Sequence, residues 1–598
     1  MNELNRTLIT YSVRNNLLIF LGTAFFAVHT LAYIIYFKLN FPHGDDIDYT
    51  LRIAHEYAKT GQFPFSEFIS SASSHLTYSL KLISLPNLLW NSFDVVNFYY
   101  LQWILMSLTL FFLFLIIKRT SKSLFWVLIP ISAFVYCPIF ITGYFVFSAL
   151  MWLSVSLCIS IVVYLVTTKK ITPLVSTAAI SVAVYSSFFN LIGLMAWLPG
   201  IISFLRKDSE QKLSYKKWLI PWIICASIFG IIFLSLAPSI ANQSKLDLFF
   251  SLDGLSFVVT YLATSYRFGT ENIVLSKIIG FITLLLCGYL FYFFWKINKE
   301  NFQKAYPWLL LVIISIVAGM CIAIGRMDLG YHDGNESFYK TISFFSQIGI
   351  LVLFSMILLE IKKNARNRMS YVKIGLIILI IVSQMIFLIP SYYAGWVKGD
   401  YYFQEKMAYV NCYSLTHGSE CLIAPPFHGM APAFERGHYE LEFFNFLAEN
   451  QLGIFGEMDF NQQNRHDLNE FRGILENNSD IEPGFGKIEK INGKLISEQS
   501  IVIEESFVNI EGWILDKNKM SVNSIFLMID NKPLLKYDDF IYRENIKENS
   551  DDISESNSDW NIIFLSGYIE KGCHEITIIG LSNETLVKLE QKIELCRI

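Results

Sequence analysis

The first two thirds of the chain alternate between long apolar runs and short polar connections. Each run is close to the roughly 20 apolar residues that a helix needs to cross a bilayer core. Every span is expected to be helical, because lipid offers no water to free backbone groups. The eleven predicted spans are 16–37, 98–117, 124–143, 145–166, 171–188, 189–205, 218–237, 274–295, 307–325, 341–359 and 374–391. The pair 171–188 and 189–205 is the shortest and could be one bent span.

The pattern changes after residue 391. From about residue 500, short apolar stretches partly alternate with polar residues, and acidic or Asn-rich connections separate them. Several short strands with polar turns are typical of a β-sandwich. The stretch before them is mixed, with a helix expected at 441–450. We therefore predict an α-helical polytopic membrane bundle over 1–391, a connecting region over 392–499 and a β-sandwich over 500–598.

Composition excludes a water-soluble enzyme, since 53% of the 598 residues are hydrophobic and only 16% are charged. Lys and Arg exceed Asp and Glu by 29 to 17 up to residue 391, whereas acids exceed bases by 34 to 18 after it. Nucleic-acid binding is not expected, because the basic surplus lies between apolar segments.

The basic residues between the spans predict the orientation. With the N-terminus in the cytoplasm, the inner loops hold 20 Lys and Arg and the outer loops hold 8, as positive-inside proteins do. An odd number of spans then places the region after residue 391 outside. Merging 171–205 into one span would reverse the side of every later loop and put two later basic clusters outside. The charges therefore favour eleven spans over ten. The first run is expected to be an uncleaved anchor, because no small-residue cleavage site follows it.

Cysteine positions agree with this orientation. Five cysteines lie in predicted spans, and the other four lie in the region predicted to be outside. An even number of cysteines in an exported segment fits two disulfides, with four free thiols as the alternative. The disulfide candidates are Cys412, Cys421, Cys573 and Cys596.

The first outer loop, 38–97, carries three carboxylates just after the first span, at positions 45, 46 and 48. They could cap the helix expected from Thr50 to Thr60, which ends at Gly61. Alternatively, one of them could act as a general base, its proton affinity raised by its like-charged neighbours. Later in the loop, His75 precedes an interfacial helix expected at 78–90, and is either structural or part of a site.

The order Asp45-Asp46-x-x-Tyr49 resembles the acidic signature in the first outer loop of GT-C superfamily glycosyltransferases. These membrane enzymes transfer a sugar from a polyprenyl-phosphate carrier. The resemblance implies a multi-span bundle with an outward-facing site, and often a soluble C-terminal domain on the same side. It also implies that Asp45 is the catalytic base and that Asp46 stands in the place of the usual second acid.

A second element lies between the ninth and tenth spans. Gly325-Arg326-x-x-x-Gly330, followed by Ser337-Phe338-Tyr339-Lys340-Thr341, resembles an element of bacterial GT-C-like proteins found in O-antigen modification. Phe338 stands where that pattern has Arg. A lipid-linked sugar phosphate needs positive charge at the outer interface, so Arg326 and Lys340 are expected to bind it; interfacial anchoring is the alternative.

The outer stretch 238–273 contains Tyr266, Arg267 and Glu271, which either bind an acceptor sugar or cap the eighth span. Asp45, Asp46 and His75 could in principle hold a divalent cation. The enzymes that the chain resembles generally work without one, so we assign no metal and no cofactor.

The resemblance therefore predicts a bacterial inner-membrane glycosyltransferase. It would move a sugar from a polyprenyl-phosphate carrier to a cell-surface glycan such as O-antigen, inverting the anomeric configuration. Its partners would be the lipid-linked donor, a polysaccharide or lipid-linked glycan acceptor and membrane lipid. The alternative is a polysaccharide polymerase or a non-enzymatic surface-polymer assembly protein. Arg is scarce in the outer loops, which disfavours a polymerase, and spans without paired charges disfavour a transporter.

Overall fold

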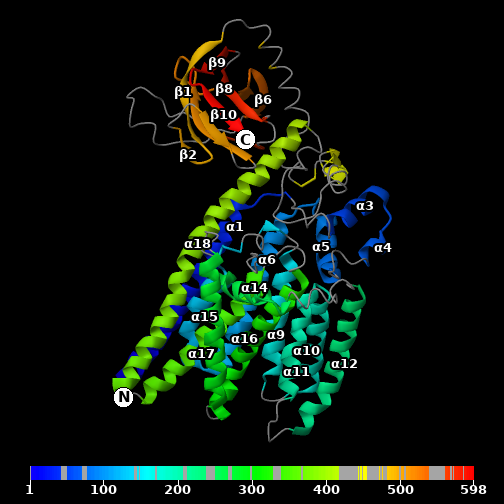
Figure 1. Ribbon diagram of the computed structural model, residues 1–598, viewed down its shortest axis with the longest axis vertical. Helices are drawn as coiled ribbons and strands as arrows, with labels where there is room; N and C mark the ends of the chain where they lie inside the picture. The colour runs from blue at the N-terminus through cyan, green and yellow to red at the C-terminus, as the bar shows by residue number, and fades with distance from the viewer. Residues whose placement is uncertain are drawn as a thin grey trace. The chain divides into compact units, whose positions relative to one another are not determined.

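The computed structural model divides the chain into two compact units, Met1–Gly399 and Asp400–Ile598 (Figure 1). We describe each unit by itself. The structure describes residues 2–41, 50–69, 77–140, 145–146, 149–168, 171–205, 212–236, 249–266, 273–296, 299–326, 339–364, 368–416, 442–443, 445–447, 449–450, 452–453, 471, 475, 481–496, 500–503, 507–537, 559–565, 569, 571–582, 585–589 and 590–597.

The first unit is helical. Six of its helices contain an apolar stretch long enough, by length and composition, to cross a membrane. These stretches coincide with six predicted spans, which supports a membrane protein. The helices are α1 (Asn2–Phe37), α6 (Val96–Thr120), α15 (Ile273–Lys296), α16 (Lys299–Arg326), α17 (Lys340–Asn364) and α18 (Arg368–Thr416).

Four of the other five predicted spans contain shorter apolar helices of 10–17 residues, fewer than the roughly 20 that a bilayer core needs. The fifth, 218–237, lies in α12 (Lys212–Leu236), a helix of 25 residues whose apolar stretch is Lys217–Phe233. Eleven spans therefore stays a prediction. The four shorter elements are η2 (Lys122–Val127) with α7 (Leu128–Val135), α9 (Leu150–Val166), α10 (Pro173–Ser187), and η4 (Leu191–Trp197) with α11 (Leu198–Leu205).

The stretch 171–205 forms two helical segments rather than one bent helix. α10 ends at Ser187, and Asn190 begins η4 by accepting a hydrogen bond from the Gly193 amide at 3.0 Å. Gly193 lies against the end of α10, because a Cβ there would be only 1.9 Å from the Ser186 carbonyl oxygen. The break at Phe189 and Asn190 is therefore where the sequence predicted it.

The helix α14 (Leu252–Ala263) was not predicted. It continues into η6 (Thr264–Tyr266), within the stretch expected to be an outer loop. Glycines let this helix approach its neighbours: a Cβ on Gly280 of α15 would lie 1.7 Å from the Val259 carbonyl oxygen, and one on Gly319 of α16 would lie 2.5 Å from the Tyr261 ring. Residues 257–266 are buried, so α14 belongs to the bundle core.

The first outer loop contains the two predicted helices. α3 (Arg52–Thr60) ends at Gly61, which adopts the left-handed conformation with φ of 68°. α5 (Tyr78–Trp90) contains Pro86, as expected, and the four-residue α4 (Phe65–Phe68) lies between them.

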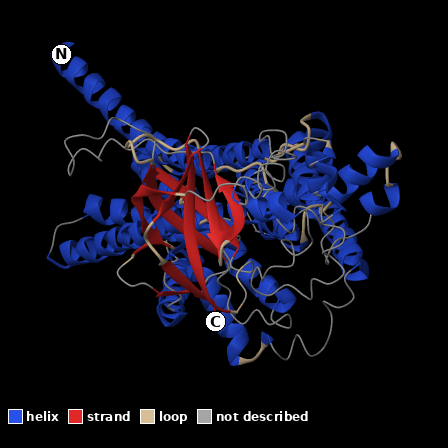
Figure 2. Ribbon diagram, turned by 90° about the horizontal axis from the view of Figure 1, so that it is seen from above, coloured by secondary structure: helices blue, strands red, loops and turns tan. Residues whose placement is uncertain are grey.

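The second unit is rich in strands, which confirms a β-structured C-terminal region (Figure 2). The strand order is β3-β10-β8-β9-β1-β4-β7, with β2 beside β1 and with β5 joining β8 to β6. β1 pairs antiparallel with β4 and parallel with β9, and this pairing connects the two halves of the sheet. The strands are β1 (Glu482–Ile491), β2 (Lys494–Leu495), β3 (Ser500–Ile503), β4 (Phe507–Leu515), β5 (Ser524–Ile529), β6 (Lys532–Tyr537), β7 (Asp559–Leu565), β8 (Gly572–Ser582), β9 (Thr585–Leu589) and β10 (Ile593–Arg597).

Inward-facing residues from both halves of the sheet form one apolar core, which includes Ile510, Trp560 and Ile578. The sheet begins at Glu482, inside the predicted connecting region, so the predicted start at 500 was too late. β1 was missed because Pro, Gly and four Lys or Glu residues give it a weak strand pattern. The described residues between 442 and 449 are helical, as expected for 441–450.

Candidate functional site

Much of the predicted site lies outside the described residues. This applies to Asp45, Asp46, Tyr49, His75, Arg267, Glu271 and Cys421. Arg326 and Cys412 lie in α16 and α18, but their side chains are not described. The roles predicted for these residues therefore stay predictions. Tyr339, Lys340, Cys573 and Cys596 are described.

Lys340 is the first residue of α17, and only 3% of its surface is exposed. Its Nζ donates a hydrogen bond to the Cys137 carbonyl oxygen at 3.3 Å. Within the described residues, no carboxylate pairs with this ammonium. A lysine that merely anchors a helix at the interface extends its charge to water. The burial of Lys340 therefore argues against simple anchoring at the interface.

Tyr339 is also buried, with 1% of its surface exposed. Its ring centroid lies 5.7 Å from that of Trp152 in α9, and 6.2 Å from those of Phe257 and Tyr261 in α14. Tyr339 therefore packs between α9 and the unpredicted helix α14, and these contacts help to fix the start of α17.

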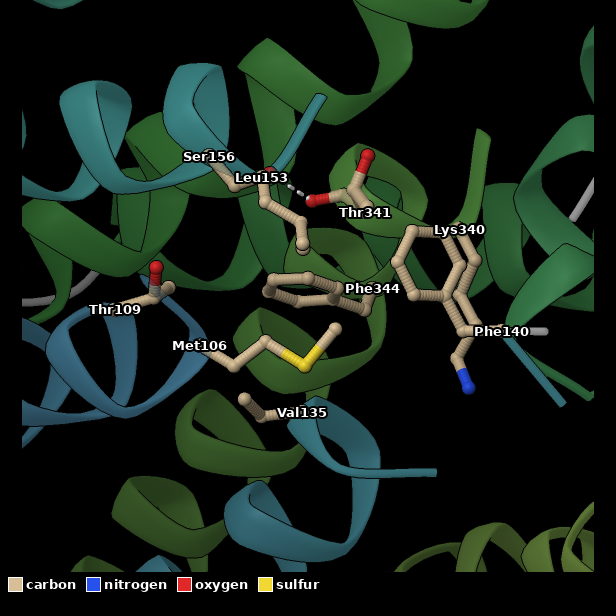
Figure 3. A pocket seen from close by; sticks show the side chains of 9 residues that line it. All are labelled: Met106, Thr109, Val135, Phe140, Leu153, Ser156, Lys340, Thr341 and Phe344. Atoms are coloured by element: carbon tan, nitrogen blue, oxygen red, sulfur yellow. Dashed lines mark hydrogen bonds between the residues drawn. The ribbon is translucent and has the colours of Figure 1, made fainter. Parts of the chain in front are cut away.

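A small cavity lies beside Lys340 (Figure 3). Its volume of about 10 Å³ is enough for about one water molecule and far too small for a sugar. The Ser156 hydroxyl donates to the Thr341 carbonyl oxygen at its edge, which ties α9 to the first turn of α17. The lining residues are Met106, Thr109, Val135, Phe140, Leu153, Ser156, Lys340, Thr341 and Phe344.

The turn after α7 lies between Lys340 and the first span. The Thr30 hydroxyl of α1 donates to the Tyr136 carbonyl oxygen, while Lys340 donates to the carbonyl oxygen of the next residue, Cys137. Tyr33, one helical turn after Thr30, is buried and donates to the Gly395 carbonyl oxygen at 3.0 Å. The C-terminal half of α1 and the start of α17 therefore contact the same two-residue turn.

Both flanks of the predicted acidic motif are fixed within this unit. On the N-terminal side, Asn40 accepts a hydrogen bond from the Val95 amide at 2.9 Å. On the C-terminal side, Thr50 is buried and accepts a hydrogen bond from the Ser84 hydroxyl of α5 at 3.1 Å. The chain on either side of 42–49 is thus attached to the start of α6 and the middle of α5.

Sequence reasoning missed a buried polar cluster on α17. The hydroxyls of Ser343 and Thr264 lie 2.6 Å apart. Gln347 accepts a hydrogen bond from the Tyr266 hydroxyl at 3.0 Å, and donates to the Leu262 carbonyl oxygen at 2.9 Å and the Thr283 hydroxyl at 3.2 Å. The available signal was polar residues at helical spacing inside an apolar span. The cluster fixes the rotation of α17 next to Lys340.

Lys81 of α5 is a second buried cation that the sequence did not single out, with 2% of its surface exposed. Its Nζ donates to the carbonyl oxygens of Glu67 and Phe68, each at 3.0 Å, and so holds the end of α4. Burial lowers the pKa of Lys81 to about 8, and the nearby Glu67 carboxylate partly opposes that shift. Lys81 therefore ties α4 to α5.

Cys573 and Cys596 form a disulfide between β8 and β10, at positions that pair directly in the sheet. No group of three His, Cys, Asp or Glu side chains arranged to hold a metal ion occurs among the described residues. No protein-family model matches the chain, and comparisons with curated proteins and with solved structures also find no match.

Proposed function

We propose that the chain is an integral membrane glycosyltransferase that moves a sugar from a polyprenyl-phosphate carrier to a cell-surface glycan. The observation that carries this proposal is Lys340, a buried cation at the start of an apolar helix with no carboxylate partner in the described residues. Removing an ammonium from water costs several kcal/mol. A phosphate group on a bound lipid would offset that cost.

The proposed reaction is a single displacement. Asp45 takes the proton of an acceptor hydroxyl, whose oxygen then attacks the anomeric carbon of the donor sugar. The bond between that carbon and the phosphate oxygen breaks, and the carrier phosphate leaves with the electron pair. Lys340 and Arg326 stabilise this anion. Attack from the opposite face inverts the anomeric configuration, and no metal is required.

Two contacts support placing the base and the cation in one site. The turn at Tyr136 and Cys137 contacts both α1 and Lys340, and the flanks of 42–49 are attached to the middle of α5 and the start of α6. The cavity beside Lys340 has room for about one water molecule, so we assign to this lysine only a contact with one oxygen of the donor phosphate. Asp46 is proposed as the second acid, and the remaining predicted residues as sugar contacts.

The proposal also includes the predicted orientation, with eleven spans, a cytoplasmic N-terminus and an external C-terminal domain in the bacterial inner membrane. The Cys573–Cys596 disulfide supports this orientation, because stable disulfides form in oxidising compartments. The basic residues of the inner loops support it independently.

The test replaces Asp45 with Asn in the bacterium and analyses the sugar composition of its surface polysaccharide. We expect one sugar to be lost, and the same loss for Lys340→Met. Asp253→Asn, which removes an exposed carboxylate from the start of α14, is the matched control and should leave the polymer unchanged.

An unchanged polymer in a well-inserted Asp45→Asn variant would refute the base assignment. A polymer of altered length but unaltered composition would favour the polymerase alternative. If deleting the protein abolishes the polymer but both site variants make a normal polymer, the assembly-protein alternative is favoured.

A further inference from the structure

A second cavity lies at the far end of the bundle from Lys340. It reaches Glu360, about 30 Å further along α17 at the rise of an α-helix. Its volume is about 370 Å³, within the range of small-molecule sites. The lining comes from the ends of α6 and α17 and the starts of η2 and α16, and comprises Thr120, Ser121, Ser123, Leu124, Asn301, Lys304, Met356, Leu359 and Glu360.

One side of this cavity offers hydrogen-bond donors. Lys304 pairs with Glu300 at 2.7 Å, but both side chains are exposed, so this pair contributes little to stability. The ammonium keeps two further N–H donors for a ligand. Ser121 and Ser123 place their hydroxyl oxygens 2.7 Å apart, so only one of the two protons is used between them. An ammonium and a free hydroxyl proton together suit a phosphate oxygen.

The lining also offers an acceptor. Glu360 of α17 lines the cavity, and its carboxylate has no ion pair or hydrogen bond with any described residue. The lining therefore carries one cation and one carboxylate, and its net charge is zero. A purely anionic ligand would leave Glu360 beside a second negative charge, whereas a ligand with both charges would pair each of them.

Apolar side chains complete the lining. Leu124, Met356 and Leu359 also line the cavity, and the last two lie at the end of α17, which is long and apolar enough to span a bilayer. A ligand here would have its polar part among charged groups and its apolar part along a span, as a membrane lipid does.

We propose that this cavity binds the head group of a phospholipid that carries a phosphate diester and a primary ammonium, the phosphatidylethanolamine class. The phosphate accepts from Lys304 and a serine hydroxyl, and the ammonium donates to Glu360. The site does not depend on the glycosyltransferase proposal. If the predicted orientation holds, the lipid belongs to the cytoplasmic leaflet.

The test uses the full-length protein, delipidated and reconstituted in vesicles of one lipid class at a time. Native mass spectrometry then measures how much lipid stays bound. We expect phosphatidylethanolamine to be retained about tenfold more than phosphatidylglycerol, which lacks the ammonium, or phosphatidylcholine, whose methylated ammonium cannot donate. Soluble glycerophosphoethanolamine should bind much more weakly, because it lacks acyl chains.

Two variants identify the contacts. Glu360→Gln should abolish the preference among the three lipids, and Lys304→Met should weaken the retention of all three. Lys296→Met is the matched control: this cation is hydrogen-bonded to Tyr292 at the same end of the bundle but outside the lining, and its loss should change nothing. If Glu360→Gln fails to insert, Ser123→Ala tests the phosphate side, because this serine is exposed and should tolerate the change.

Equal retention of phosphatidylglycerol would overturn the proposal, as would an unchanged preference in Glu360→Gln. Glycerophosphoethanolamine binding as tightly as the lipid would overturn the lipid assignment in favour of a soluble ligand. None of these readouts is the polysaccharide, so a failure here is distinguishable from a failure of the proposed enzymatic function.

Discussion

Removing the Cys573–Cys596 disulfide should destabilise the second unit by an amount that the structure sets. The two cysteines are 23 residues apart, so the bond closes a loop of that length in the unfolded chain. The chain-entropy relation gives about 3.4 kcal/mol at 25 °C for such a loop. Since each 1.4 kcal/mol changes an equilibrium constant about tenfold, the unfolding equilibrium constant of the unit should be about 300 times larger without the disulfide.

Hydrogen–deuterium exchange of the full chain in detergent measures this. The Cys573→Ser/Cys596→Ser double variant should exchange the most protected amides of β8 about 300-fold faster, because β8 is central and its Ile576 and Ile578 are fully buried. Cys225→Ala, a free cysteine of α12, serves as the control. Acceleration below tenfold would mean that strand pairing alone sets the stability and would refute the entropy argument. A reduced cysteine pair in protein taken from intact membranes would contradict the external placement.

Three further predictions concern the first unit. Lys340→Met should lower the rate of sugar transfer about 100-fold, because a charged hydrogen-bond donor is lost. The melting temperature should not fall, because the cost of desolvating a buried ammonium disappears with it. Turnover and thermal unfolding, measured together, check this. Gly280→Ala should lower the free energy of unfolding by about 1–3 kcal/mol, since its Cβ would lie 1.7 Å from the Val259 carbonyl oxygen, whereas Gly288→Ala, with open space at that position, should not. Burial lowers the pKa of Lys81 from its ordinary 10.5 to about 8, so between these values the unfolded state binds more protons than the folded state, and stability rises with pH. Thermal unfolding at pH values inside and below that window should show the rise in the wild type and not in Lys81→Met.

The apolar helices were predictable because hydrophobicity is a local property of the chain, and each predicted span coincides with a helix. Helix lengths were less predictable. The break at Asn190 depends on a side chain that caps the next turn, and four apolar runs form helices of only 10–17 residues. α14 was missed because 12 residues are too few to read as a span, and its burial comes from glycines of α15 and α16 that follow it in the chain.

The candidate site was predictable only as a list of residue types. The motif around Lys340 indicated a cation, but its burial depends on Cys137, which lies 203 positions away. The same holds for Lys81, whose partners belong to a four-residue helix that carries too little periodicity to be predicted. The local sequence predicts neither the contact of Lys340 with Cys137 nor that of Lys81 with α4, because each arises from how separate elements pack.

The buried polar face of α17 explains how one cation can be held inside an apolar bundle. Lys340, Ser343 and Gln347 follow one another at intervals of three and four residues, so they lie on one side of the helix. Gln347 makes three hydrogen bonds to α14, η6 and α15, and these fix the rotation of the helix. Rotation in turn decides whether the ammonium reaches the turn next to α1 or enters lipid. The polar cluster therefore positions Lys340 without touching it, and the geometry available to a bound phosphate is set two turns away.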